Sequence, residues 1–192
     1  ISLDPDLPEA DNSLGGILLE SGDVAHAEAA FREAIRIQPD YAEAHSNLGN
    51  ALSTSDRFEE ARYHFEIALR LQPDYAAARY NYALALARVN RFAEAQRQIE
   101  AMLRLEPGNA AAHDLLGNLL LAEGKPQPAL NEFREAIRIR PDFGRAQLDL
   151  GEALADSGDT AAALPQLRAA AQSPQPAVRQ EAAQLLQRLG AR

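Results

Sequence analysis

Apolar residues recur along this chain at helical spacing, in segments of about 14 residues that are separated by short polar turns. Residues 44–52 form one such segment, in which Leu48 and Leu52 are four residues apart. The next segment carries Ala61, Phe65 and Ala68, at intervals of four and three residues. Residues at these intervals lie on one face of an α-helix. The pattern therefore predicts amphipathic helices that follow one another in pairs.

Two kinds of turn separate the predicted helices. The short turn within a pair carries Gly, Asn, Asp or Ser, which tolerate left-handed backbone or cap free amide groups. These turns are residues 21–23, 55–57, 89–91, 123–125 and 157–159. The turn between pairs carries a proline, which cannot continue a helical hydrogen-bond ladder. These prolines are 34 residues apart, at Pro5, Pro39, Pro73, Pro107 and Pro141.

Other positions keep the same 34-residue period. A small residue in the first helix recurs at Gly15, Gly49, Ala83, Gly117 and Gly151. A bulky residue in the second helix recurs at Phe31, Phe65, Ile99, Phe133 and Leu167. With this period and these residues, the chain resembles the tetratricopeptide repeat family, whose unit is a helix–turn–helix. Its repeats resemble most in style the tetratricopeptide repeats of bacterial proteins and of O-linked N-acetylglucosamine transferases. The family's usual tryptophan is replaced by Asp11, His45, Arg79, His113 and Gln147.

The resemblance implies an all-α fold, a right-handed superhelical α-solenoid of about five helix–turn–helix units with a C-terminal capping helix. Residues 1–7 match residues 35–41 and are expected to end a truncated preceding repeat. The capping helix is expected over residues 178–190, where an apolar stripe opposes an Arg- and Gln-rich face. Pro165 is expected to kink or delay the last second helix. The five units are predicted at 8–41, 42–75, 76–109, 110–143 and 144–177.

Composition narrows the classes of partner. A net charge of −9 argues against nucleic acid and against anionic membranes, which require basic patches. No apolar run approaches the ~18 residues of a membrane span, so no membrane insertion is predicted. The chain has no cysteine, which excludes disulfides and fits the cytoplasm and the periplasm equally.

Residues with catalytic or metal-binding chemistry are scattered. His45 and His113 share one repeat position two units apart, and His26 and His64 are expected on a different surface, in second helices. Gly124 and Lys125 do not form a phosphate loop, because a proline follows them where Ser or Thr must hold magnesium. Neither a zinc-protease sequence nor a nucleophile elbow is present. The sequence thus predicts no metal, no cofactor and no catalytic residue, and the chain is interpreted as not an enzyme.

The resemblance implies that first helices line a concave groove that holds extended peptides. Carried over by register, the candidate groove residues are Asn47, Asn50, Tyr80, Asn81, Leu84, Arg88, Asp114, Asn118, Arg145, Asp149 and Glu152. The asparagine amides would hold a peptide backbone, since each offers a donor and an acceptor. The alternative is that they are merely solvated polar residues. Tyr80 and Leu84 would anchor a side chain, or would pack between repeats.

The charges of the groove favour one kind of ligand. The groove contains no lysine, so it does not fit the clamp by which related chaperone-binding members hold a C-terminal carboxylate. The C-terminal end of the groove carries three acidic residues and one basic residue, Arg145. The acidic residues are Asp149, Glu152 and Asp156, and this excess of negative charge predicts a basic or neutral ligand segment there.

The leading interpretation is a scaffold that binds a protein or peptide. Two alternatives stay open: a substrate-recognition arm of a larger enzyme such as a glycosyltransferase, and end-to-end self-association through an uncapped N-terminal end.

Overall fold

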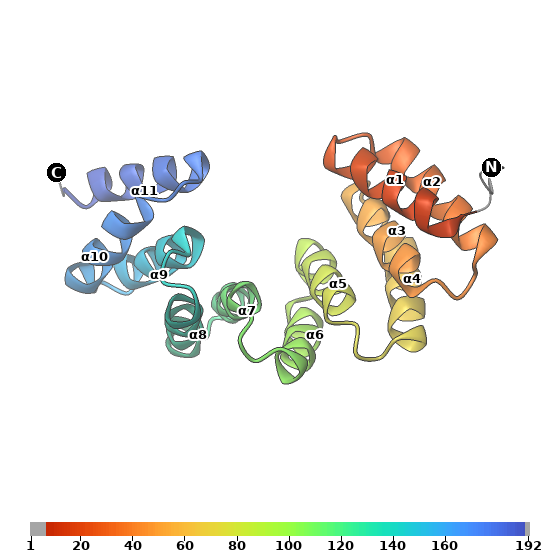
Figure 1. The fold of residues 1–192 in the computed structure, drawn as a ribbon. Helices are drawn as coiled ribbons and strands as arrows, with labels where there is room; N and C mark the ends of the chain where they lie inside the picture. Colours follow the sequence, from red (N-terminus) through yellow and green to blue (C-terminus); the bar gives the residue numbers. More distant parts are fainter. Residues whose placement is uncertain (1–6, 191–192) are drawn as a thin grey trace. The chain divides into compact units, whose positions relative to one another are not determined.

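The computed structural model describes residues 7–190, and this part of the chain consists of eleven α-helices without a strand (Figure 1). The predicted fold class, an all-α solenoid of helix–turn–helix units, is confirmed. Residues 1–6 of the predicted preceding repeat lie outside the described part. The helices are α1 (Pro8–Glu20), α2 (Val24–Ile37), α3 (Ala42–Thr54), α4 (Phe58–Leu71), α5 (Ala76–Arg88), α6 (Phe92–Leu105), α7 (Ala110–Ala122), α8 (Pro126–Ile139), α9 (Gly144–Asp156), α10 (Thr160–Ala170) and α11 (Pro176–Arg188).

The helices belong to two compact units. The first unit ends at Leu105 and contains α1 to α6, and the second unit begins at Glu106 and contains α7 to α11. Within each unit a first helix packs against its own second helix, and that second helix packs against the next first helix. No helix of the described residues is long and apolar enough to cross a membrane.

Left-handed residues close every turn inside a pair. Gly22, Gly124 and Gly158 have positive φ, as do Asp56 (φ 58°) and Asn90 (φ 60°) at the same repeat position. In each turn the next amide bonds back to the first helix, as Lys125 N–H does to the Leu120 carbonyl at 2.9 Å. Glycine adopts this backbone without strain, and Asn and Asp are the best substitutes. The turn signals in the sequence therefore have a direct structural cause.

Aromatic side chains of the second helices fill the space left by small residues of the first helices. A Cβ atom built on Gly117 would lie 2.5 Å from Cε1 of Phe133, which is too close for a real contact. The third repeat instead pairs Ala83 with the smaller Ile99, and both are fully buried. The sizes of the two residues match, which explains why both positions are periodic. Together they form one contact between the two helices of each repeat.

Donor side chains replace the family's tryptophan and fix the turn between repeats. At this position Nε2 of His45 lies 3.1 Å from the Pro39 carbonyl, and Nη2 of Arg79 donates to the Pro73 carbonyl at 2.8 Å. His113 contacts the Pro107 carbonyl at 3.1 Å, and Gln147 donates to the Pro141 carbonyl at 2.7 Å. Each bond satisfies a carbonyl that the proline turn leaves without a helical partner.

The same position also contacts the second helix, and one prediction about it is wrong. Nδ1 of His45 lies 2.9 Å from Nδ1 of His64, so these histidines share a site and do not lie on different surfaces. The position of the family's tryptophan lies between the two helices of a repeat, and His64 faces this position from the second helix. Nδ1 of His113 contacts Glu132 at 2.7 Å from the corresponding place.

Proline has a smaller effect on the last pair than the sequence suggests. α10 continues through Pro165 and starts at Thr160, in register with the other second helices, so the predicted delay is wrong. It is 11 residues long, whereas α8 has 14. α11 follows and packs against α9 and α10 through Val178 and Ala182, which are buried. Its span begins two residues before the predicted capping helix.

α1 exposes an apolar face. Leu14 is 49% exposed and Ile17 is 66% exposed. The corresponding residues Leu48 and Ala51 in α3 are buried, where α2 packs on that helix. This face is where the sequence predicts self-association, which stays a prediction.

Candidate functional site

The candidate residues of the first unit lie on α3 and α5, and they differ in what they contact. Asn47 is half-buried and donates from Nδ2 to Oδ1 of Asn12 at 2.9 Å. Asn12, buried on α1, in turn donates to Tyr41 (3.3 Å) and Glu43 (3.0 Å). Asn47 therefore links two neighbouring first helices, a role that neither interpretation of the asparagines included.

Asn50 and Asn81 are also half-buried, but their amides have no hydrogen-bond partner within residues 7–190. Leu84 is 38% exposed on the same helix as Asn81, and Arg88 forms a loose ion pair with Asp56 at 3.5 Å. Tyr80 is half-buried on that helix. The side-chain amides of Asn50 and Asn81 are thus not used by the fold, whereas Asn47 is committed to it.

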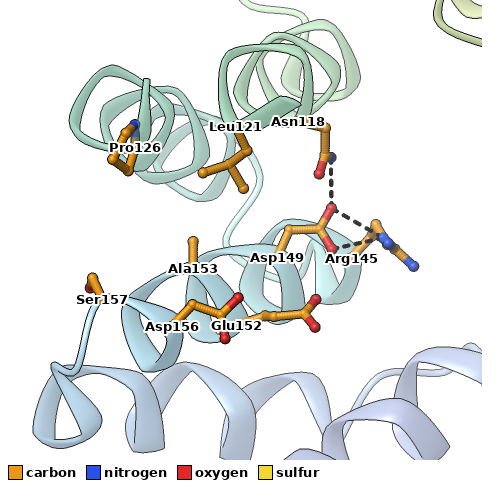
Figure 2. A pocket seen from close by; sticks show the side chains of 9 residues that line it. All are labelled: Asn118, Leu121, Pro126, Arg145, Asp149, Glu152, Ala153, Asp156 and Ser157. Atoms are coloured by element: carbon orange, nitrogen blue, oxygen red, sulfur yellow. Dashed lines mark hydrogen bonds and ion pairs between the residues drawn. The ribbon is translucent and has the colours of Figure 1, made fainter. Parts of the chain in front are cut away.

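All candidate residues of the second unit except Asp114 line a cleft between α7 and α9 (Figure 2). The cleft has a volume of about 450 Å³. Four predicted residues contribute to its wall: Asn118 from α7, and Arg145, Asp149 and Glu152 from α9. The remaining wall is formed by Leu121, Pro126, Ala153, Asp156 and Ser157. Pro126 was missed by the sequence reasoning, which considered only first helices, although α8 begins at the cleft.

Asp149 organises the polar side of the cleft. It is only 4% exposed, yet both of its carboxylate oxygens are bonded. Asn118 donates from Nδ2 to its Oδ2 at 2.8 Å, and Arg145 Nε lies 3.0 Å from its Oδ1, as Figure 2 shows. Asn118 also donates to the Asp114 carbonyl at 3.1 Å, and Arg145 reaches Glu181 at 3.3 Å. The Asn118–Asp149 bond thus links α7 to α9, and the Arg145–Glu181 bond links α9 to α11.

The wall of the cleft is predominantly acidic. Burial raises the pKa of Glu152, and the nearby carboxylates of Asp156 and Asp149 raise it further. Burial also raises the pKa of Asp149, against the lowering effect of its bonds to Asn118 and Arg145. Carboxylates that raise the pKa of Glu152 create a region of negative potential around it. Arg145 is the one basic residue of this wall.

Asp114 lies behind this wall and not in it. It is 8% exposed, and its Oδ1 has no hydrogen-bond partner among the described residues. Burial, followed by the charge of Asp149, raises its pKa to about 7. The sequence assigned Asp114 to the groove, and Asp114 does not line this cleft.

Metal-ion chemistry has no support in the described residues, which contain no group of three His, Cys, Asp or Glu side chains arranged to hold a metal. The arrangement offers hydrogen-bond donors, acceptors and negative charge along first helices.

Comparison with known families now identifies the repeat. Two models described as tetratricopeptide repeat match residues 52–119 and 115–177, and a model described as TPR repeat matches residues 15–56. Together the matches run from residue 15 to residue 177. The chain belongs to the tetratricopeptide repeat family. No curated protein matches the sequence of this tetratricopeptide repeat chain closely enough to count as a relative.

Solved structures share the fold of this tetratricopeptide repeat chain. Pseudomonas aeruginosa pilF superposes with a TM-score of 0.82 at 23% identity, over 95% of this chain and 91% of that one. MamA from Desulfovibrio magneticus RS-1 gives 0.74 at 20% identity, over 85% and 92%. YrrB, described as a TPR protein with an unusual peptide-binding site, gives 0.68 at 20% identity, over 94% of each chain.

Proposed function

We propose that this chain is a protein-interaction scaffold whose first helices bind an extended polypeptide segment, with the cleft of the second unit accepting a basic side chain. The observation that carries the proposal is the cleft, whose wall contains four residues that the family resemblance assigned to peptide binding. The peptide-binding site described for YrrB, which shares the fold, supports the same use of the repeats.

The chemistry of the first helices suits an extended segment. A peptide backbone presents N–H and C=O groups along its length, and an asparagine amide pairs with either. Asn50 and Asn81 have such amides free of bonds to the described residues, on helices that contact each other. The activity proposed is binding without turnover. Neither a transferase arm nor any other catalytic role has an observation in its favour here.

Charge complementarity predicts which segments bind the second unit. A short fluorescent peptide that alternates glycine with lysine is expected to bind the full chain, and a glycine–glutamate peptide is not. Binding should weaken as salt rises, because exposed charges are screened. Glu152→Gln should lower the affinity for the lysine peptide roughly five-fold, or about 1 kcal/mol, which is the contribution of one exposed charge pair. Fluorescence anisotropy measures all three effects.

Asp142→Asn is the matched control. Asp142 is exposed, lies in the second unit outside the wall of this cleft, and loses the same charge. It should leave the affinity of the lysine peptide within about two-fold of the unaltered chain. Equal binding of the lysine and glutamate peptides, or an equal loss in both variants, would show that the cleft does not select basic segments.

A further inference from the structure

The two units use the same repeat positions for different side chains. In the first unit these positions hold Asn12 on α1 and Asn47 on α3, whose amides hydrogen-bond at 2.9 Å. In the second unit the corresponding residues are Asp114 on α7 and Asp149 on α9. α7 contacts α9, as α1 contacts α3. A pair of amides is thus replaced by a pair of buried carboxyl groups.

Two carboxylates cannot copy the amide pair, because neither has a hydrogen to donate. A carboxyl pair becomes compatible with burial when one member carries a proton. Asn118 and Arg145 both donate to Oδ2 of Asp149, and Arg145 also lies 3.0 Å from its Oδ1 as an ion pair. Asp114 is also buried and has an oxygen without a partner among the described residues. Of the two groups, Asp114 is therefore the one that holds the proton.

The surrounding charges do not neutralise a second carboxylate. The groups that act on Asp114 are Asp149 and Arg145 from α9 and Arg140 from the turn after α8. Arg145 is already shared between Asp149 and Glu181 from α11. Arg140 is exposed and lies 3.6 Å over the ring of Phe143. Next to Asp114 on α7, His113 pairs with Glu132 from α8.

We propose that Asp114 and Asp149 share one proton in the free protein, and that a guanidinium or ammonium group entering the cleft displaces this proton to solvent. The second part of this proposal, the displacement of the proton by a ligand, rests on the proposed function. Asp149 lines the cleft and Asp114 lies behind it, so a cation beside Asp149 and Glu152 favours the ionised form of both carboxyl groups. The proton leaves Asp114 and is taken up by buffer. The raised pKa of Asp114, about 7, agrees with a proton that is held near neutrality and is easily displaced.

The shared proton makes a prediction that needs no ligand. Asp114→Asn is isosteric and supplies permanently the N–H donor that the protonated acid supplies only at low pH. The urea midpoint of the variant should exceed that of the unaltered chain at pH 8, and the gap should close towards pH 5. The sign follows from a folded pKa above the unfolded value: stability from this group is present below the unfolded pKa and is lost as pH rises towards 7.

Asn12→Asp places a carboxyl group at the position in the first unit that corresponds to Asp114. It places a carboxylate beside Glu43 and removes the donor to Tyr41, so its midpoint should fall at pH 8 and recover towards pH 5. Urea midpoints of the unaltered chain and Asp114→Asn that run parallel from pH 5 to pH 8 would overturn the shared proton.

The displacement of the proton is tested by calorimetry with the glycine–lysine peptide in two buffers of different ionisation enthalpy at pH 7. The unaltered chain should release about half a proton per peptide bound, and Asp114→Asn should bind the peptide with almost no proton release. Binding without proton release in both proteins would overturn the displacement. Absence of binding to either protein would overturn the proposed function and the displacement together, while the urea midpoints would still decide whether the proton is shared.

Discussion

Gly117→Ala is expected to destabilise the chain by about 1–3 kcal/mol, because the new methyl group overpacks a filled contact. Its Cβ would lie 2.5, 2.7 and 2.9 Å from three ring atoms of Phe133, which is fully buried and cannot turn away. Alanine is a better helix former than glycine, so propensity alone predicts the opposite sign. Urea denaturation followed by circular dichroism measures the change in the free energy of unfolding.

The third repeat indicates how to restore the contact. It combines Ala83 with Ile99, both fully buried. The double variant Gly117→Ala/Phe133→Ile should therefore recover most of the stability lost in Gly117→Ala. Phe133→Ile alone should destabilise the chain, because the smaller side chain leaves a cavity. Gly16→Ala is the matched control, since nothing lies within 4 Å of its new Cβ in helix α1. That variant should gain about 0.5–1 kcal/mol. Equal effects of the two alanine substitutions would contradict the packing argument.

Acid is expected to destabilise the first unit through its histidine pair. Nε2 of His45 faces the Pro39 carbonyl and must donate to it, so Nδ1 of neutral His45 accepts from Nδ1–H of His64. Protonating His45 places two N–H donors against each other at 2.9 Å, because Nδ1 of His45 then also carries a hydrogen. Burial, and then the charge of His45, lowers the pKa of His64 to about 4, and burial lowers that of His45.

The direction of the pH effect follows from these shifts. An unfolded histidine titrates near 6.5, so the unfolded chain takes up protons that the folded pair refuses. The stability is fully present above pH 6.5 and falls as pH drops from 6.5 towards 4, by an amount on the order of 2 kcal/mol for this pair of one buried and one half-buried ring. The measurement is the urea midpoint of unfolding at pH 7.5 and pH 5.

His64→Gln is the matched variant, because the next repeat has Gln98 at this position, accepting from Arg79 at 3.1 Å. Glutamine can donate to His45 and carries no titrating proton. The variant should lose much less stability than the unaltered chain between pH 7.5 and pH 5. Identical pH profiles for the two proteins would rule out the pair as the cause.

The period of the sequence predicts the helix pairs well because each periodic residue has one local reason. Gly117 and Phe133 meet within one repeat, and Gly124 adopts the left-handed backbone that ends a helix. Such reasons depend on a single residue type at a single position. A repeated sequence displays them several times, so the fold class follows from the residues alone.

The polar contacts between helices were harder to predict. Asn47 and Asn50 look equivalent in the sequence, yet Asn47 bonds Asn12 from the preceding repeat, and Asn50 bonds nothing within the described residues. His45 and His64 are 19 residues apart, and their contact depends on how two helices turn towards each other. A hydrogen bond between helices requires a suitable residue on each helix, and a periodic pattern shows only one position at a time.

The most direct test of binding by first helices is a selection of peptides from a random phage-displayed library on the unaltered chain. The selected peptides are then measured against Asn50→Ala/Asn81→Ala, against Glu152→Gln, and against Asn131→Ala, which alters an exposed residue of second helix α8. Each peptide should lose about five-fold or more in affinity in one of the two first-helix variants and keep its affinity in Asn131→Ala. Peptides that bind all three variants as tightly as the unaltered chain would contradict the account.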